Sequence, residues 1–429
     1  MDFPSSFIFG TATSSPQSEG CFEGSDWRGW ERAGRVVPSG RGNGKPDHIE
    51  EDFTNLMQLG LTHHRTSLEW SRIEPQKGVY NREAIDYYRQ VMDIARQKGM
   101  SLWVCLHHFT LPSWFVRMGG FLDSSAIMYW HRYVELIGRE LGGLADYWMP
   151  VSQPVYYALA TNLLAKLPPG KKRMDKFLDM LAAIYRAHGD AYRLLKTYVP
   201  PRAKIGLNSL VIPTFPCDEE SESDTIAAEF VDTYLNKFSL DLIKEGSANL
   251  PGKGAVELPT CRGAADFLGV DYFFRLLVSG SPDAPVSKCL EELCLGEGVP
   301  AMALYQEGDM LSECGYGARP EGVYEAIKRI YQSSLDLPIY ITGTGLATED
   351  EDQRSEYIRC LLGSIHQAIE QGLDLCGLLY WSDVDAYEWT SGYDLHYGLF
   401  GFDKHTGERL KRPAADLLGK TAREGVLPE

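Results

Sequence analysis

The sequence has fewer basic than acidic residues, and this deficit limits its partners. Lysine and arginine together number 42, against 59 aspartate and glutamate residues, which gives a formal net charge of −17. The phosphates of nucleic acids and anionic lipid surfaces repel a protein of this sign. We therefore predict no nucleic-acid partner and no membrane partner.

Long apolar runs and paired cysteine motifs are also missing. No stretch reaches the roughly 18 apolar residues of a transmembrane helix. Residues 1–6 lack the basic region and apolar stretch of a signal peptide, so we expect a cytoplasmic protein. The nine cysteines are odd in number and include no C-x-x-C pair, which favours reduced thiols. We predict no metal and no cofactor.

The sequence does contain a regular alternation of strand-like and helix-like segments. Short apolar or β-branched stretches recur at residues 7–14, 61–70, 101–109, 146–152, 203–210, 266–274, 338–343 and 376–382. Amphipathic helical patterns lie between them, for example at 82–98, 174–198 and 353–371. This alternation predicts an α/β protein, a (β/α)8 TIM barrel forming one domain over residues 1–429. Segments 36–47 and 281–317, rich in glycine, proline and charge, are predicted as long loops at its C-terminal face.

Short motifs follow one another in a fixed order along the chain. They are FPSSFIFGTAT (3–13), QSEG (17–20), RTSLEWSRIEP (65–75), HFTLP (108–112), DFLGVDYF (266–273) and WSDVDAYEW (381–389). Together they resemble the motifs of family 1 glycoside hydrolases, the β-glucosidase family. The resemblance runs from end to end and implies the barrel fold, whereas the activity has to be argued from the site itself.

One half of the sugar site of that family is matched in full. The resemblance implies that Gln17, His108, Glu388 and Trp389 bind the hydroxyls of the sugar ring, and that Trp381 forms an apolar floor beneath it. An amide, an imidazole, a carboxylate and an indole supply both donors and acceptors, which suits a polyol. We therefore predict a small-molecule ligand with a sugar-like ring.

The catalytic half is altered. VSQP (151–154) and ITGTG (341–345) resemble the family motifs T-F-N-E-P and I/V-T-E-N-G, but each lacks the glutamate. Retaining glycosidases need two carboxylates about 5 Å apart, one as acid/base and one as nucleophile. Gln153 and Gly343 stand at these positions. A glutamine does not exchange protons near neutral pH and a glycine has no nucleophile, so ordinary retaining hydrolysis is not expected.

Neighbouring positions differ from the family as well. Ser152 stands in place of an asparagine, which shortens the reach towards the sugar, and Phe273 in place of a tyrosine. Arg65, which would face the nucleophile, is kept. A buried, unpaired guanidinium is costly, so we expect a bound anion, water or a new carboxylate to satisfy it.

Two acids are gained near the altered positions. Asp271 replaces a usual asparagine and Asp383 a usual leucine. We predict that at least one of them approaches the space beside Gly343 and, held ionised by Arg65, replaces the lost carboxylate as a base. The alternative is that both make ordinary supporting hydrogen bonds behind the site.

Three classes of function follow. The sequence favours a repurposed, non-hydrolytic enzyme of dehydratase, isomerase or cyclase type acting on a pyranose-like or cyclic-ether molecule. Relatives that act as dehydratases in bacterial antibiotic pathways show that the scaffold permits such chemistry. The alternatives are a sugar-binding pseudoenzyme without turnover and a glycoside hydrolase with a non-standard mechanism.

Overall fold

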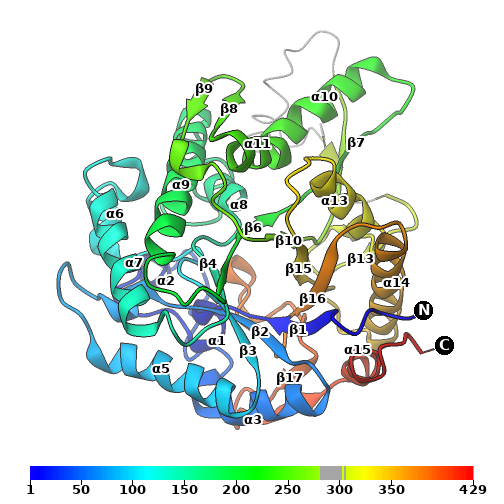
Figure 1. Ribbon diagram of the computed structural model, residues 1–429, viewed down its shortest axis with the longest axis horizontal. Helices are drawn as coiled ribbons and strands as arrows, with labels where there is room; N and C mark the ends of the chain where they lie inside the picture. Colours follow the sequence, from blue (N-terminus) through cyan, green and yellow to red (C-terminus); the bar gives the residue numbers. More distant parts are fainter. Residues whose placement is uncertain (281–301, 304–305, 429) are drawn as a thin grey trace.

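A parallel β-barrel forms the centre of the protein. The computed structural model describes residues 1–280, 302–303 and 306–428 (Figure 1). The barrel strands are β1 (Ile8–Ala12), β2 (His63–Ser67), β3 (Ser101–Cys105), β4 (Tyr147–Met149), β5 (Lys204–Ile205), β6 (Leu207–Leu210), β10 (Leu268–Asp271), β15 (Ile339–Thr344) and β16 (Leu375–Trp381). They lie in the order β5-β4-β3-β2-β1-β16-β15-β10-β6, and every neighbouring pair is parallel. Only Gly206 separates β5 from β6, so the sheet closes on itself with eight strand positions, and the predicted single-domain TIM barrel is confirmed.

Each predicted strand-like stretch contains a barrel strand, although the ends differ. The stretch at 61–70 ends earlier than predicted because the side chain of Glu69 accepts a hydrogen bond from the backbone N–H of Ser71. This cap begins the short helix α4 (Trp70–Ile73) immediately after the strand. The motif at 65–75 therefore covers the end of β2 and the helix α4 that follows it.

Helices surround the barrel. They are α1 (Ser15–Glu19), α2 (Asp26–Arg32), α3 (Lys45–Gln58), α5 (Arg82–Gln97), α6 (Ser113–Arg117), α7 (Ile127–Leu141), α8 (Pro154–Asn162), α9 (Met174–Leu195), α10 (Glu222–Asp232), α11 (Phe238–Glu245), α13 (Gly322–Tyr331), α14 (Glu351–Glu370) and α15 (Pro413–Glu424). Capping side chains set several starts: Asn81 accepts from the N–H of Ala84 at α5, and Asp350 accepts from the N–H groups of Asp352 and Gln353 at α14. The predicted helices at 82–98, 174–198 and 353–371 are therefore present with small shifts at their ends.

Short strands decorate the connections. They are β7 (Thr214–Pro216), β8 (Ser247–Leu250), β9 (Gly254–Glu257), β11 (Leu276–Val278), β12 (Met302–Ala303), β13 (Met310–Leu311), β14 (Gly317–Ala318), β17 (Phe400–Phe402) and β18 (Arg409–Lys411). The loop predicted at 36–47 ends at Gly44, since α3 begins at Lys45. Of the loop predicted at 281–317, residues 281–301 and 304–305 lie outside the described residues, and the remainder contains β12, β13 and the start of β14.

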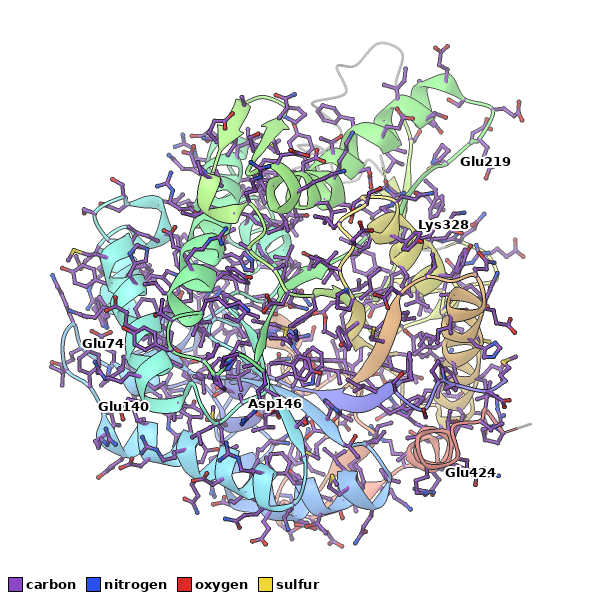
Figure 2. The ribbon with its side chains drawn as sticks, in the orientation of Figure 1. Glu74, Glu140, Asp146, Glu219, Lys328 and Glu424 are labelled. Carbon is purple, nitrogen blue, oxygen red and sulfur yellow. The ribbon has the colours of Figure 1, made fainter. Side chains whose placement is uncertain are left out.

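The inside of the barrel is filled by aromatic side chains. The rings of Trp103 and Tyr147 stack at a centroid distance of 3.7 Å, and Phe267 and Tyr340 meet the Trp103 ring edge-on at 5.2 and 5.0 Å. Side chains also fill the space between the barrel and the helices around it (Figure 2). Because the barrel interior is packed, a ligand site has to lie at an end of the barrel.

The chain ends lie side by side at one edge of the molecule (Figure 1). The N–H of Phe3 donates to the carbonyl oxygen of Gly425 at 2.7 Å. In the described part of the chain, no helix has the length and apolar character needed to cross a membrane.

Candidate active site

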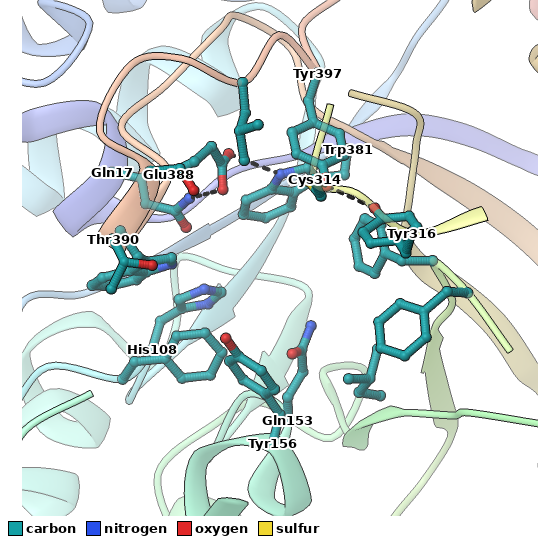
Figure 3. A pocket seen from close by; sticks show the side chains of 17 residues that line it. Gln17, His108, Gln153, Tyr156, Cys314, Tyr316, Trp381, Glu388, Thr390 and Tyr397 are labelled. Atoms are coloured by element: carbon teal, nitrogen blue, oxygen red, sulfur yellow. Dashed lines mark hydrogen bonds between the residues drawn. The ribbon is translucent and has the colours of Figure 1, made fainter. Parts of the chain in front are cut away.

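A pocket of about 260 Å³ opens at the C-terminal end of the barrel. Its lining includes seven residues predicted from the sequence: Gln17, His108, Gln153, Phe273, Trp381, Glu388 and Trp389 (Figure 3). These residues lie at the ends of strands β1, β3, β4, β10 and β16, or in the connections that follow them. Segments far apart in sequence meet here because all parallel strands of a barrel end at the same face.

Hydrogen bonds hold the polar side of the pocket in place. Gln17 Nε2 donates to Glu388 Oε2 at 2.9 Å, and Trp381 Nε1 donates to Glu388 Oε1 at 3.3 Å (Figure 3). The hydroxyl of Ser14 donates to Gln17 Oε1 at 2.7 Å, which fixes the orientation of that amide. Burial raises the pKa of Glu388 to about 8, and the donors only partly oppose it. Glu388 therefore holds a proton over much of the neutral range.

His108 lies between the two indoles that shape the apolar side. Its ring is nearly parallel to those of Trp381 and Trp389, at centroid distances of 6.0 and 6.3 Å. Burial, reinforced by the charge of Arg65, holds the pKa of His108 well below its usual value. A neutral imidazole offers one donor and one acceptor, which suits a hydroxyl group.

Arg65 lies fully buried beneath the pocket, and groups of the barrel accept hydrogen bonds from both of its Nη atoms, whereas its Nε has no partner among the described residues. Its Nη1 donates to both carboxylate oxygens of Asp271, at 2.9 and 3.0 Å, and to the carbonyl oxygen of Thr342 at 2.9 Å. Its Nη2 donates to Ser152 Oγ at 2.8 Å and to Asn208 Oδ1 at 3.3 Å. Of the partners expected for Arg65, the structure supplies the new carboxylate.

Asp271 accepts further hydrogen bonds around the same group. Asn208 Nδ2 and Thr342 Oγ1 donate to Oδ1, at 2.9 and 2.8 Å. Gln153 Nε2 donates to Oδ2 at 2.5 Å. Asp271 is 1% exposed and does not line the pocket. Its carboxylate is thus occupied on both oxygens and lies behind Gln153.

Asp271 also occupies the space in front of Gly343. A Cβ atom at position 343 would lie 2.9 Å from Asp271 Oδ1 and 3.2 Å from Arg65 Nη1. The first distance is shorter than ordinary carbon–oxygen contacts, so even a methyl group at position 343 would displace the carboxylate. Of the two candidate acids, Asp271 is therefore the one beside Gly343.

Asp383, the other candidate acid, lies away from Gly343 and differs in this from its proposed role as a replacement base. It is 1% exposed, forms an ion pair with Lys45 at the start of α3, and lies 4.0 Å from His64 Nε2. It neither lines the pocket nor contacts Arg65 or Gly343 within the described structure. The buried ammonium of Lys45 requires carboxylates nearby, and Asp383 and Asp52 supply them.

Two predicted ligand-binding residues also lie outside the cavity. Arg65 and Ser152 are both 0% exposed and do not line the pocket. Ser152 Oγ accepts from Arg65 and donates to Asn208 Oδ1 at 2.9 Å. These two side chains hold the floor beneath the ligand space and do not reach into it.

The sequence argument missed several residues of the site. Asn208 joins Arg65 to Asp271, and its polarity within a buried strand was an available signal. Tyr156 follows Gln153 by three residues and faces the cavity from the first turn of α8.

A further group of lining residues consists of Cys314, Tyr316 and Tyr397. The Tyr397 hydroxyl lies 3.0 Å from Cys314 Sγ and 2.7 Å from the Tyr316 hydroxyl. These three come from irregular connections, where no pattern marks them.

The backbone of the pocket is locally strained. Phe109, Gln153 and Trp389 have φ angles of 73°, 45° and 52°, in the left-handed region that side chains disfavour. All three line the pocket. Strain of this kind persists only where the surroundings impose it, and it is concentrated at functional sites.

Residues 1–424 match the sequence model described as "Glycosyl hydrolase family 1". The chain belongs to this family. It is 26% identical to beta-glucosidase A of Thermotoga maritima, over 95% of each chain. It is 28% identical to a beta-galactosidase of Sulfolobus acidocaldarius, over 100% of this chain and 96% of the relative.

Solved glycosidase structures match almost the whole chain. A beta-glycosidase from Pyrococcus horikoshii matches with a TM-score of 0.90 and 32% identity, over 100% of this chain and 96% of that one. The Thermotoga maritima beta-glucosidase in complex with glucoimidazole matches with a TM-score of 0.87 at 23% identity, over 99% of this chain and 100% of that one. At 23% identity, the similarity to the Thermotoga maritima structure supports only a shared fold.

Proposed function

We propose that this family 1 protein binds a small molecule with a pyranose-like ring and does not perform the two-carboxylate retaining hydrolysis of β-glucosidases. One observation carries the proposal. Among the described residues that line the pocket, Glu388 is the only carboxylate. Retaining hydrolysis requires two that reach the substrate.

The composition of the pocket supports a sugar-like ligand. Trp381 and Trp389 offer apolar ring faces, while Gln17, His108 and Glu388 offer donors and acceptors within the same cavity. Such a mixture suits a ring whose faces are C–H bonds and whose edge is hydroxyl groups. The beta-glucosidase from Thermotoga maritima, which has the same fold, forms complexes with the sugar-like molecules glucoimidazole and deoxynojirimycin.

The geometry around positions 153 and 343 supports the loss of hydrolysis. We take Gln153 and Gly343 as the positions of the family's acid/base and nucleophile, on the basis of the flanking motifs. Asp271 fills the space beside Gly343, but its oxygens accept from Arg65, Asn208, Thr342 and Gln153. A carboxylate so engaged and buried beneath Gln153 is a poor nucleophile and has no access to a ring in the pocket.

This arrangement changes the order of the functional alternatives. A repurposed enzyme that uses Asp271 or Asp383 as its base is not favoured, because neither carboxylate lines the pocket. The binding role becomes the better supported function. A repurposed acid–base enzyme stays the second candidate through Glu388, whose pKa of about 8 lets it give or take a proton near neutrality.

A chromogenic assay tests the absence of hydrolysis. Purified protein, incubated with aryl β-glucosides, β-galactosides and β-fucosides, should show turnover near background, because coupled catalytic residues fail together. The Pyrococcus horikoshii beta-glycosidase serves as the positive control. A kcat on the order of 1 s⁻¹ or more for any of these substrates would refute this part of the proposal.

Calorimetry with glucoimidazole and deoxynojirimycin tests the binding role. Glu388→Ala should weaken binding about three- to tenfold at neutral pH, because Glu388 is then protonated and a hydrogen bond between uncharged groups is worth roughly 0.5–1.5 kcal/mol. The control is Glu349→Ala, which removes an acid whose side chain is 79% exposed and which does not line the pocket. Equal affinities in wild type and Glu388→Ala would place the ligand elsewhere.

A further inference from the structure

The contact between Gln153 and Asp271 fixes which end of the glutamine amide faces the pocket. Asp271 Oδ2 receives the Gln153 side chain at 2.5 Å and also lies 3.0 Å from Arg65 Nη1. A carboxylate paired with a guanidinium only accepts hydrogen bonds. The Gln153 atom beside it must therefore be the NH2 group, since two acceptor oxygens at this distance would repel each other.

The other end of the amide is then an acceptor that faces the cavity. Gln153 lines the pocket, and its side chain points into the space bounded by His108, Tyr156 and Trp381 (Figure 3). Among the described residues, the Gln153 amide forms a hydrogen bond through Nε2, to Asp271, and none through Oε1. A ligand hydroxyl or amine is the natural partner for this oxygen.

We propose that Asp271 is a positioning residue that holds the Gln153 amide with its oxygen towards the ligand, so that the pocket selects a molecule with a hydrogen-bond donor at this point. The inference rests on the proposed function, in which Gln153 stands where a glycosidase would meet the glycosidic oxygen. A glycoside offers an ether oxygen there, which can only accept. A free sugar or other ring alcohol offers an O–H, which can donate.

Two matched ligands measure this preference. β-D-Glucose and methyl β-D-glucoside differ only in the group on the anomeric oxygen, so the Kd of glucose is expressed per β anomer. Wild type should bind glucose more tightly by about three- to tenfold, the usual range for one neutral hydrogen bond. Gln153→Ala removes the acceptor, so its ratio of the two Kd values gives the steric effect of the methyl group alone.

Asp271→Asn should reverse the amide of Gln153. At position 271, Oδ1 accepts from Arg65, Asn208 and Thr342, whereas Oδ2 accepts from Arg65 and Gln153. The carbonyl oxygen of an asparagine is therefore placed better at Oδ1, where three donors point. Its NH2 group then faces Gln153, which has to turn its own oxygen towards it. The glutamine would now present a donor to the cavity. Relative to wild type, the preference for glucose over methyl β-D-glucoside should fall about three- to tenfold.

The double variant Gln153→Ala/Asp271→Asn separates positioning from a general loss of structure. Its ratio of Kd values should equal that of Gln153→Ala, because Asp271 acts through Gln153. An unchanged ratio in Asp271→Asn alone, or a shifted ratio in the double variant relative to Gln153→Ala, would overturn the proposal.

A joint neutron and X-ray structure of the wild-type protein decides the amide orientation without any substitution. Both deuterons of the Gln153 amide should lie on the atom next to Asp271. A map that shows the oxygen there would overturn the inference even if sugars bind. If the map agrees but neither glucose nor its methyl glycoside binds, the proposed sugar-binding function fails and the amide orientation stands.

Discussion

Asp271 and Arg65 form a buried ion pair at the centre of the barrel end, with exposures of 1% and 0%. Removing one member of such a pair leaves the other charge without compensation in a region that water does not reach. The hydrogen bonds from Asn208 and Thr342 add to the stabilisation of Asp271. This pair therefore affects both the stability of the barrel and the shape of the pocket floor.

The first prediction concerns that charge. Asp271→Asn keeps the size of the side chain but leaves Arg65 unpaired, and we expect it to lower the free energy of unfolding by about 3 kcal/mol. Thermal and urea unfolding measure the change. The control is Asp394→Asn, an exposed acid, which should change stability little. Equal unfolding midpoints for Asp271→Asn and wild type would show that the pair contributes little.

The second prediction follows from the pKa of Glu388. Folding raises this pKa from 4.5 to about 8, so the folded protein keeps a proton that the unfolded chain has already lost. The contribution of Glu388 to the free energy of unfolding therefore falls as the pH rises from about 4.5 to about 8, and is constant beyond either limit.

Glu388→Gln removes this contribution, and comparing it with wild type isolates it from other groups such as Glu19 and Asp26, whose pKa values burial also raises. The stability of the variant relative to wild type should increase with pH, by up to about 1.4 kcal/mol per unit. Melting curves between pH 5 and 8.5 provide the measurement. Parallel curves for the two proteins would contradict the assigned pKa.

At the scale of elements, the neighbouring strands β10 and β15 leave room for only one carboxylate side chain between Asp271 and Gly343. The register between these neighbouring strands shifts at Val270 and Asp271, so that Asp271 pairs with Gly343. A Cβ at position 343 would lie 3.0 Å from Asp271 Cγ. The absence of a side chain on one strand is therefore what accommodates the acid on the other.

The third prediction is a coupling between these two positions. Gly343→Glu should destabilise the protein, because a second acid is forced against the first in a packed interior. In Asp271→Asn/Gly343→Glu the single negative charge beside Arg65 is restored from the other strand. We expect this double variant to be more stable than the sum of the two single effects predicts, by about 1–3 kcal/mol. Additive changes in unfolding free energy would show that the two positions do not compete.

At the scale of the whole molecule, the pocket is a joint product of strands that are distant in sequence. Gln17 and Glu388, which are hydrogen-bonded in the pocket, lie 371 residues apart. The barrel brings them together because its first and last strands are neighbours, with β1 paired to β16. The barrel thus places a cavity lined by polar and aromatic side chains where these strands end.

The fourth prediction rests on the proposed absence of hydrolysis and concerns its gain by substitution. The triple variant Gln153→Glu/Asp271→Asn/Gly343→Glu supplies an acid/base and a nucleophile while keeping one charge beside Arg65. We expect its turnover of an aryl β-glucoside to exceed that of wild type by on the order of 10²-fold. Gln153→Glu alone, with one carboxylate, is the matched control and should stay near background. A folded triple variant without any gain would mean that Ser152 and Phe273 also prevent the chemistry.

The sequence by itself determined the barrel and the polar half of the pocket. Alternating strand and helix patterns specify a (β/α)8 architecture, since buried parallel strands and amphipathic helices have distinct periodicities. The motifs then place Gln17, His108, Trp381, Glu388 and Trp389 at strand ends, which a barrel gathers at one face. Their common location follows from topology alone.

Only the tertiary structure decided which of the two candidate acids lies beside Gly343 and pairs with Arg65. Both Asp271 and Asp383 are close to strand ends, but Asp271 meets Arg65, 206 residues away, and Asp383 meets Lys45, 338 residues away. A local pattern does not specify such partners. The partner of each aspartate depends on which buried cation its side chain reaches once the strands have paired. A buried carboxylate is stable only beside a group of opposite charge. For the same reason, only the folded chain shows that Arg65 and Ser152 support the pocket floor from below.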